Sequence, residues 1–527
     1  MIDRNKKRIN GNNEGIAEEN VCSTFFVCTK SEGWSVVRVK ISSGIKENEA
    51  YIRKQCENCD DIIIRPMRLG EGKKVDCLVV YIEVAVSNMM LEDSVIGKLM
   101  NHFWEISPDR MKEFLKNNSL GISDVKELAT MEEAIKAMLA GNAIFFMDGY
   151  AKAIKISSKG YPNLGVSEAE REKVLRGSKE GFSDSAKSNS ALIRKRIRST
   201  GLKVEEQFVG RRSDTLLHIL YIEDLVYEPL LEEIKERLGK FEIDGILDSG
   251  MIEQLTEENW LSPFPQFQTT ERPDRAAMEL LNGRIVLIVD NSPVALLLPT
   301  TFNNFLQVSE DKYNRFQLVS FLRSLRFAAV IMAMLLPGLY LSVIRFHTQI
   351  LPGNLILSFA QAREGVPFSA IVELVFLELA FELIREAGVR MPGSLGNAMG
   401  IIGGLIIGQA AVEANLVSPI VVMIVALTAL GSLAIPNTEF SSPFRMLKYG
   451  FLFLGGFFGL FGMILGMYGL IGHLAGLTSF HIPYLMPYVG RELDRGQGDT
   501  IFRKPFYQMR KRPMYANKKN RIRLRRK

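Results

Sequence analysis

Two hydrophobic patterns divide the chain near residue 326. Before this point, short apolar runs alternate with amphipathic stretches, which is the pattern of an α/β or α+β domain. Beyond it, long stretches contain no Asp, Glu, Lys or Arg, and one of them covers residues 449–490. Stretches of this kind predict membrane-spanning helices and exclude a fully soluble protein.

The soluble half is expected to contain two lobes. Apolar runs predict strands, and runs that mix charged residues with Leu, Ile or Met at helical spacing predict helices. Residues 160–190, rich in Gly, Ser, Lys and Glu, are interpreted as a linker or loop between the lobes. The expected strands are Cys22–Cys28, Val75–Val86, Ala143–Met147, Leu216–Ile222 and Phe241–Ile246, and the expected helices are Asp93–Phe103, Met131–Ala140 and Glu228–Lys240.

A β-hairpin is predicted next to the membrane region. The apolar runs Ile285–Val289 and Val294–Leu298 are short, and turn residues separate them, so a hairpin is favoured over a membrane span. The predicted fold class is a two-lobed α/β (α+β) soluble N-terminal domain followed by an α-helical multi-span membrane domain. The expected segments are a disordered N-terminus at 1–20, soluble lobes at 21–160 and 161–322, a transmembrane domain at 323–490 and a basic tail at 491–527.

The number of spans stays open between four, five and six. Arg323 and Arg326 are expected to anchor the first span at the membrane interface. Five spans put the basic tail on the far side of the membrane, and four spans export several basic loop residues. A sixth span after Gly472 would keep both the tail and these loop residues on the cytoplasmic side. The candidate spans are Phe327–Ile344, Phe368–Ile384, Leu395–Val412, Val417–Ile435 and Gly450–Gly472, and Leu351–Ala360 is too short to cross.

The net charge of +6 comes from the tail, because residues 491–527 carry 14 Lys and Arg against 3 acids. A basic segment directly after a membrane region is expected to lie on the lipids of an anionic cytoplasmic leaflet. Nucleic acid is not an expected partner, since no base-reading module accompanies the tail.

No catalytic, cofactor-binding or metal-binding residues are expected. The chain contains no phosphate-binding loop, no paired metal motif and no nucleophile with a base. All five cysteines lie in the first 77 residues and are interpreted as reduced thiols. The first 20 residues lack the apolar core of a signal peptide, so the N-terminal domain is expected in the cytoplasm.

The acidic candidate span carries the clearest functional pattern. Glu378, Glu382 and Glu386 recur every four residues and share one helix face. Such groups at membrane depth must face water or a protein interior. One interpretation is an ion pathway lined by Glu373, Glu378 and Glu382, and the others are an internal ion-pair network and an interfacial helix. The candidate ion-pair or gating network is Arg385, Glu386, Arg390 and Glu413.

Glycines form a stripe on the next candidate span. Gly396, Gly400, Gly404 and Gly408 are each four residues apart, and a row of small residues allows helices to approach closely. A second row lies at 455–469. The rows fit helix packing within one chain, contacts between subunits, or a moving gate.

The sequence resembles the A subunits of GerA-type spore germinant receptors over roughly residues 56–485. Two less distinctive matches lie upstream, at Asp60-Asp61-Ile-Ile-Ile-Arg65 and Asn189-x-Ala191-Leu-Ile-Arg194. The distinctive matches, in order, are Ser262-Pro-Phe-Pro-Gln266, Thr270-Glu-Arg-Pro-Asp274, Gly283-Arg284 with Val289-Asp290-x-Ser292-Pro293, Ser324-Leu325-Arg326, Glu364-x-Val366-Pro367-Phe368, Arg385-Glu-Ala-Gly-Val-Arg390-x-Pro392 and Gly408-Gln-Ala-Ala-Val412.

This resemblance implies a multi-pass protein in the inner membrane of the bacterial spore, with its N-terminal domain in the cytoplasm. It implies a transporter-like B subunit and a lipoprotein C subunit as partners, and a homo-oligomeric ring, a pentamer, that releases cations when a nutrient triggers it. The expected function is therefore that of a nutrient-gated cation-channel subunit. The alternatives are a non-conducting scaffold that relays the signal, and a paralogue that amplifies ion release.

Overall fold

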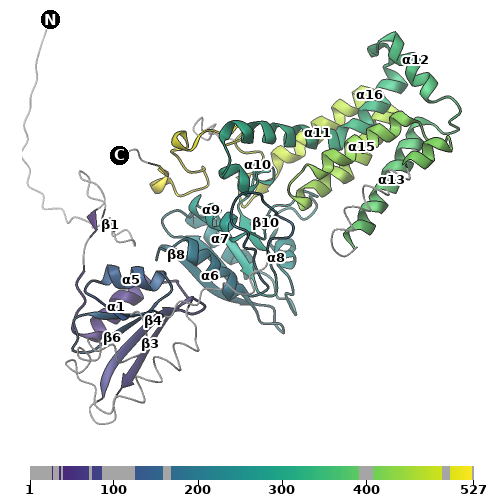
Figure 1. The fold of residues 1–527 in the computed structure, drawn as a ribbon. Coiled ribbons are helices and arrows are strands. Elements are labelled where there is room, and N and C mark those ends of the chain that lie inside the picture. The colour runs from purple at the N-terminus through teal and green to yellow at the C-terminus, as the bar shows by residue number, and fades with distance from the viewer. Residues whose placement is uncertain are drawn as a thin grey trace, which may run out of the picture.

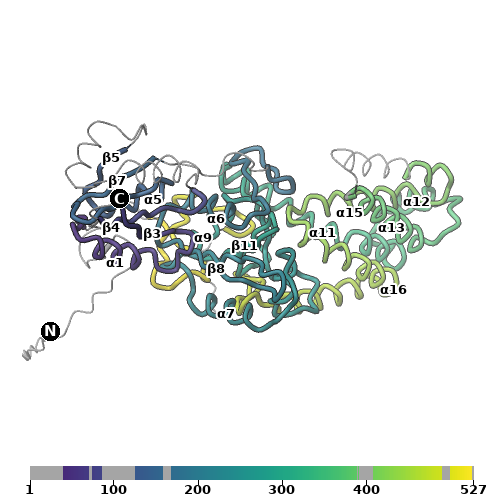
Figure 2. The backbone as a smooth tube through the Cα atoms, turned by 90° about the horizontal axis from the view of Figure 1, so that it is seen from below, coloured from purple at the N-terminus to yellow at the C-terminus, as the bar shows by residue number. Residues whose placement is uncertain are grey.

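The computed structural model describes residues 26–27, 35–36, 39–69, 74–85, 125–157, 168–390, 408–489 and 499–524. A first α/β lobe, a second α/β lobe and a helical bundle follow one another along the molecule, as Figures 1 and 2 show. The expected disordered N-terminus at 1–20 and the expected helix Asp93–Phe103 lie outside the described residues.

Lobe 1, at residues 39–157, is an antiparallel sheet with strand order β3-β4-β6-β7-β5. Successive residues of β4 point to opposite faces, so Leu78 and Val80 pack with the helices while Cys77 and Val79 belong to a second apolar cluster. A pair of short strands, β1 (Phe26–Val27) and β2 (Ser35–Val36), precedes the lobe. Its elements are α1 (Ile45–Gln55), β3 (Ile62–Leu69), β4 (Val75–Ile82), β5 (Val125–Leu128), α5 (Met131–Leu139), β6 (Ala143–Met147) and β7 (Ala153–Ile156).

Lobe 2, at residues 168–312, contains a second sheet with strand order β10-β12-β11-β9-β8. Helices α6 and α9 pack on one face and α7 and α8 on the other, so β9 and β11 are buried on both sides and read as continuous apolar runs. Its elements are α6 (Ala186–Arg196), β8 (Leu202–Val209), β9 (Thr215–Ile222), α7 (Glu228–Leu238), α8 (Ser249–Thr256), β10 (Gln268–Thr270), α9 (Pro273–Leu281), β11 (Ile285–Val289) and β12 (Ala295–Leu298), followed by α10 (Phe302–Phe305) and the 3-10 turn η2 (Ser309–Lys312).

Most of the expected strands and helices are confirmed. The predicted hairpin is present, with β11 and β12 paired antiparallel. The strand predicted at Phe241–Ile246 is wrong, because this segment is irregular. Its apolar side chains pack into the core of lobe 2, but its carbonyl groups at Ile243 and Asp244 accept hydrogen bonds from the turn between β8 and β9 instead of joining a ladder.

Among the described residues of the helical bundle, two helices, α11 and α16, are long and apolar enough by length and composition to cross a membrane. Helix α11 begins at Phe316, well before the predicted start of the first span at Phe327, and α12 is a short helix, as expected. The bundle elements are α11 (Phe316–Phe346), the 3-10 turn η3 (Thr348–Ile350), α12 (Gly353–Ala362), α13 (Ala370–Val389), α15 (Pro419–Leu433) and α16 (Thr438–Gly476).

Helix α16 is a hairpin of two helical legs. The backbone leaves helical geometry at Gly459, where φ is 63° and ψ is −149°. On either side of this turn the legs touch, because a Cβ at Gly466 would lie 2.6 Å from Leu454 Cδ1. Phe264 of lobe 2 contacts both Phe444 on the outgoing leg and His473 on the returning leg. Both ends of α16 therefore lie next to lobe 2.

The segment after α16 folds back onto lobe 2. The short strands β13 (Thr478–Ser479) and β14 (Ile482–Pro483) pair, and Phe480 between them packs into the core of lobe 2 against Phe267. The described part of the tail, with 3-10 turns η4 (Phe506–Gln508) and η5 (Lys518–Asn520), also contacts this lobe. For example, Asn517 donates a backbone hydrogen bond to the carbonyl of Leu225. The chain therefore enters and leaves the bundle on the side of lobe 2.

Candidate functional site

The central acid of α13 is paired inside the bundle. Glu378 Oε2 lies 2.5 Å from Nζ of Lys448, and the two side chains are only 2% and 6% exposed. Glu378 on α13 therefore faces the outgoing leg of α16, which carries Lys448. Burial of two charges together is tolerated when they are paired.

The neighbouring acids are paired as well. One turn further along α13, Glu382 lies 3.0 Å from Arg445, which is one turn before Lys448 on α16. At the other end of α13, Glu373 accepts hydrogen bonds from Arg363 and from the backbone N–H of Ser418, at 3.0 and 2.9 Å. The three candidate ion-pathway acids therefore all have partners within this chain.

The predicted network residues do not form one cluster. Arg385 donates a hydrogen bond to Ser432 on α15. Glu386 and Arg390 pair with each other, exposed on the surface of α13. Glu413 accepts a hydrogen bond from Gln409 and is also exposed.

The glycine stripe is described only at Gly408, where an added Cβ would lie 3.1 Å from Val422 on α15. Gly396, Gly400 and Gly404 lie outside the described residues. In the second row, Gly455 packs directly on α11, because a Cβ there would lie 2.2 Å from the carbonyl oxygen of Gly338. At this point two helix backbones touch.

The spacing of the basic residues that pair with these acids could have been noticed in the sequence. Arg445 and Lys448 are three residues apart, so they share one face of α16, and they stand at the edge of the long charge-free stretch. Glu378 and Glu382 present the matching spacing on α13. Complementary spacing of acids and bases on two predicted spans could have suggested this pairing.

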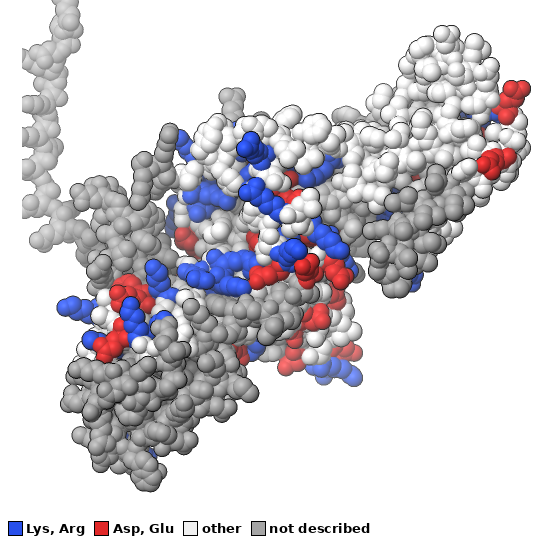
Figure 3. Space-filling model, in the orientation of Figure 1, with Lys and Arg blue, Asp and Glu red and all other residues white. Residues whose placement is uncertain are grey.

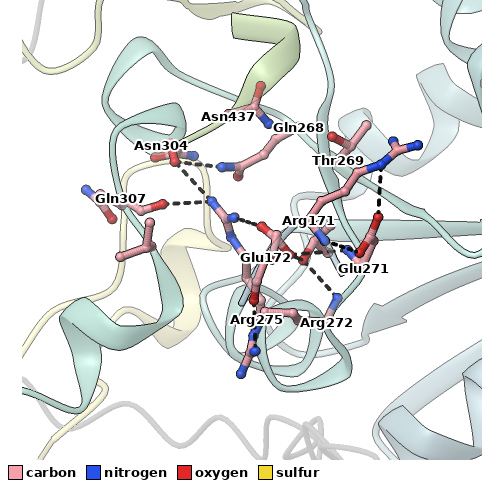
Figure 4. Close-up of polar contacts among 12 residues, drawn as sticks. Arg171, Glu172, Gln268, Thr269, Glu271, Arg272, Arg275, Asn304, Gln307 and Asn437 are labelled. Atoms are coloured by element: carbon pink, nitrogen blue, oxygen red, sulfur yellow. Dashed lines mark hydrogen bonds and ion pairs between the residues drawn. The ribbon is translucent and has the colours of Figure 1, made fainter. Parts of the chain in front are cut away.

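A second polar cluster joins lobe 2 to the bundle (Figure 4). Arg275 of α9 pairs with Glu172 and donates to the backbone carbonyl of Gln307, while Arg272 is held by Asp274. Thr269 donates a 2.8 Å hydrogen bond to Glu439, in the first turn of α16. Residues 269–275, which include the segment 270–274, thus form a structural joint between lobe 2, the 168–185 segment and the bundle.

Asp311 holds the start of α11. It pairs with Arg323 at 2.8 Å and Arg326 at 2.9 Å, and Arg323 also contacts Asp499 of the tail at 2.5 Å. The expectation that Arg323 anchors the span at the lipid interface is wrong, because its side chain is only 1% exposed. Whether an arginine side chain points to lipid or to the protein interior depends on the surrounding fold. The spacing of the arginines in the sequence does not show this.

A buried ion pair also joins the two lobes. Arg194 of α6 makes two hydrogen bonds to Asp61, just before β3, at 2.8 and 2.6 Å, and its side chain is fully buried. Burial opposes the charged form of Arg194, but the Asp61 carboxylate outweighs this and raises the pKa of the guanidinium. The two less distinctive sequence matches, residues 60–65 and residues 189–194, are therefore in contact in the structure.

A cavity of about 830 Å³ opens between α7, the β13–β14 hairpin and the tail. Glu233 and His481 line this cavity, and together with Glu258 they lie close enough to hold a metal ion. Arg237 already pairs with both of these glutamates, at 2.5 and 3.0 Å, so their charge is balanced by a protein cation.

Comparison with known proteins identifies relatives over nearly the whole chain. The family model described as Bacillus/Clostridium GerA spore germination protein matches residues 50–515. Spore germination protein KA of Bacillus subtilis is 36% identical over 485 residues, covering 92% of this chain and 89% of that protein. Spore germination protein GerLA of Bacillus cereus is 34% identical, with 92% and 97% covered.

Similarity extends to a membrane protein and to a solved domain. A Bacillus subtilis protein titled uncharacterized membrane protein YfkQ is 38% identical over 473 residues, covering 90% of this chain and 91% of that protein. Among solved structures, the N-terminal domain of the A subunit of the Bacillus megaterium spore germinant receptor GerK3 is 27% identical, with a TM-score of 0.40, and the match covers 50% of this chain and 98% of that domain.

Proposed function

Because this chain belongs to the GerA family of spore germination proteins, we propose that it is the A-type membrane subunit of a nutrient germinant receptor. The observation that carries this proposal is the family match over residues 50–515, which covers most of lobe 1 and all of lobe 2 and the bundle. In this proposal the chain acts with a B and a C subunit in the inner membrane of the spore. Lobes 1 and 2 lie in the cytoplasm.

The proposed activity is cation conduction by a homo-oligomer, a pentameric ring, when a nutrient acts on the receptor. The charge distribution of α13 supports a pathway along this helix, since Glu373, Glu378 and Glu382 can attract cations. In the described conformation these acids are paired with basic side chains or backbone. The proposal therefore assigns this conformation to the closed state, and opening must separate these pairs.

The hydrogen bonds of the polar network between α13 and α16 are incomplete. Glu378 Oε1, Arg445 Nε and the Tyr449 hydroxyl are buried without a hydrogen-bond partner among the described residues. Partly satisfied polar groups in a low-dielectric interior favour any alternative arrangement that completes their hydrogen bonds. Differential stabilisation of this kind is what a ligand on a partner subunit needs in order to shift the bundle to a second state.

The path of the chain supports an even number of crossings. Helix α11 begins beside Asp311 of lobe 2, and α16 ends beside Ser262 of the same lobe. The turn at Gly459 divides the last apolar stretch into two legs, which returns the tail to the side of lobe 2. In the proposed topology both lobes and the tail share the cytoplasmic side, as the positive-inside rule prefers.

A non-conducting scaffold is the second candidate. The pairing of all three candidate acids favours it, because an ion-pair network that only fixes helix positions needs no opening. In this case the bundle relays a movement of the joint at Thr269 and Glu439 to a separate channel.

Cation flux through sealed liposomes separates the two candidates. The native chain, with partner subunits and nutrient, is compared with Lys448→Gln, which releases Glu378, and with Glu382→Gln. Conduction predicts a higher basal flux for Lys448→Gln and a lower triggered flux for Glu382→Gln. Glu386→Gln is the matched control, since in the described part of the chain Glu386 pairs with Arg390 on the exposed side of α13 and not with α16.

The oligomer of each variant is checked by crosslinking before flux is compared. Absence of flux from a well-assembled native complex supplied with nutrient would contradict the channel proposal and favour the scaffold. Loss of assembly in Glu382→Gln, with Glu386→Gln intact, would likewise show that the acid is needed for packing.

A further inference from the structure

An exposed apolar surface lies where α11 meets the tail, outside the bundle itself. Arg503 holds the two parts together, because its backbone N–H donates to Ser320 Oγ and its guanidinium donates to the carbonyl of Asn314. We name the following residues the aromatic surface: Phe316 (37% exposed), Leu318 (51%), Phe321 (60%), Leu325 (50%), Phe502 (69%), Phe506 (48%) and Tyr507 (66%).

The aromatic surface continues a stripe that runs along α11. The exposed apolar residues Leu318, Phe321 and Leu325 follow at helical spacing, and exposed Ala328, Ile331 and Leu339 extend the stripe into the bundle. Figure 3 shows the bundle as an almost uncharged surface, in contrast to lobe 2, where charged side chains gather. The apolar stripe of α11 therefore continues beyond the bundle to the start of this helix, where α11 meets the tail.

The length of α11 fits this arrangement. Its 31 residues correspond to about 46 Å at 1.5 Å per residue. This exceeds the hydrocarbon core of about 30 Å and matches the 40–45 Å of a bilayer with its headgroup layers. The first turns of α11 consequently reach the headgroup layer when the rest of the helix spans the hydrocarbon.

The charges around the surface are arranged for an anionic partner. Arg323 and Arg326 turn inward to Asp311, so the stripe itself carries no charge. Beyond Tyr507 the tail exposes Arg510 and Lys511. Aromatic side chains with basic residues beside them are typical of the interface of an anionic membrane, and each basic residue there contributes about 1 kcal/mol.

We infer that the aromatic surface is immersed in the headgroup layer of an anionic membrane, with Phe506 and Tyr507 among the headgroups and Arg510 and Lys511 at lipid phosphates. This inference rests on the proposed membrane function and specifies its lipid contact. The tail thus binds lobe 2 with its 512–523 part and the membrane with its 502–511 part. The start of α11 is held between lobe 2 and the lipid surface.

Depth-dependent quenching tests this arrangement. An environment-sensitive fluorescent amino acid is incorporated at position 506 of the full chain in vesicles of phosphatidylglycerol and phosphatidylcholine. Two sets of nitroxide lipids serve as quenchers, one labelled near the headgroup for position 506 and one labelled near the end of the acyl chain for groups inside the hydrocarbon. Position 468, 79% exposed on the returning leg of α16, is the control for membrane insertion. Position 247, 72% exposed on lobe 2, is the control for water.

The inference predicts clear quenching at 506 and none at 247. Arg510→Gln with Lys511→Gln should reduce the quenching at 506 in anionic vesicles and leave it unchanged in pure phosphatidylcholine. Quenching at 468 but not at 506 would overturn the inference and leave the membrane function intact. No quenching at either position would contradict the membrane function itself. An unquenched, blue-shifted signal at 506 that grows with protein density would assign the surface to a second copy and overturn the inference.

Discussion

Glu378 and Lys448 form a buried ion pair that connects α13 to the outgoing leg of α16, with 2.5 Å between the carboxylate and the ammonium group. The two residues are 70 positions apart in the sequence. Because neither charged group reaches solvent, each one offsets the desolvation cost of the other. Loss of one partner leaves a buried charge without compensation, which typically costs about 3–5 kcal/mol.

We expect Lys448→Met to destabilise the bundle by about 3 kcal/mol, because the buried carboxylate of Glu378 then loses its partner. The measurement is thermal unfolding of the detergent-solubilised full chain, in which the fraction that remains folded after each temperature is determined by size-exclusion chromatography. The double variant Glu378→Leu with Lys448→Met should recover most of the loss, since it removes both charges. A double variant as unstable as the single one would show that the loss comes from packing and not from the unpaired charge.

The contact between Asp61 and Arg194 should control access to nearby thiols. Cys56 and Cys59 are buried beside it, and burial raises the pKa of the Cys56 thiol to about 12, so both should react slowly in the native chain. Asp61→Asn leaves Arg194 buried without its carboxylate and should open this edge of lobe 1. We expect thiol labelling of Cys56 and Cys59 to accelerate at least about tenfold, the factor that 1.4 kcal/mol of lost local stability gives.

Cys77 is the internal control for this labelling experiment. It is equally buried, but it lies in the apolar cluster on the other face of the lobe 1 sheet. The experiment uses a background in which Cys22 and Cys28 are serine. If Cys77 accelerates together with Cys56 and Cys59, the substitution unfolds the whole lobe and the contact has no local role.

The elements that the sequence predicts well are those that local chemistry determines. The hairpin at Ile285–Leu298 could be predicted because turn residues stand between two short apolar runs. Helix α5 could be predicted because its apolar residues follow the helical period; the structure adds a cap, in which Thr130 accepts a hydrogen bond from the backbone N–H of Glu133. In both cases the decisive residues are neighbours in sequence.

The rest depends on contacts between distant residues. The turn at Gly459 lies inside a charge-free run, where both legs are equally apolar and no polar residue marks the reversal. The direction of Arg323 is set by Asp311 and Asp499, and the partner of Glu378 is set by the packing of α13 on α16. The acidic face of α13 was found from spacing, whereas its pairing required the fold.

Stability should fall as the pH rises because of Glu253 in α8. Burial, followed by the nearby carboxylates of Glu439, Glu257 and Asp248, raises the pKa of Glu253 from 4.5 to about 8. Between these pH values the folded chain keeps a proton that the unfolded chain releases, so the free energy of unfolding decreases by at most about 1.4 kcal/mol per pH unit.

Melting of the full chain between pH 5 and about 8 tests this linkage. Glu253→Gln should be more stable than the native chain at the upper end and should flatten the pH dependence. Glu232→Gln, at an exposed position of α7, is the control and should follow the native curve. Equal slopes for the native chain and Glu253→Gln would show that Glu253 titrates normally.

Gly459→Ala should disrupt the reversal of α16. The φ of 63° with ψ of −149° belongs to a region that residues with a Cβ essentially do not adopt, and an added Cβ would lie 3.0 Å from the His347 ring. We expect a loss of about 2 kcal/mol or more in thermal unfolding of the solubilised chain. The matched control is Gly469→Ala on the returning leg, where a Cβ meets nothing within 4 Å, and which should be neutral or stabilising because alanine favours helix. If Gly459→Ala melts like Gly469→Ala, α16 tolerates a continuous helix through this position, and the return of the tail to lobe 2 loses its structural basis.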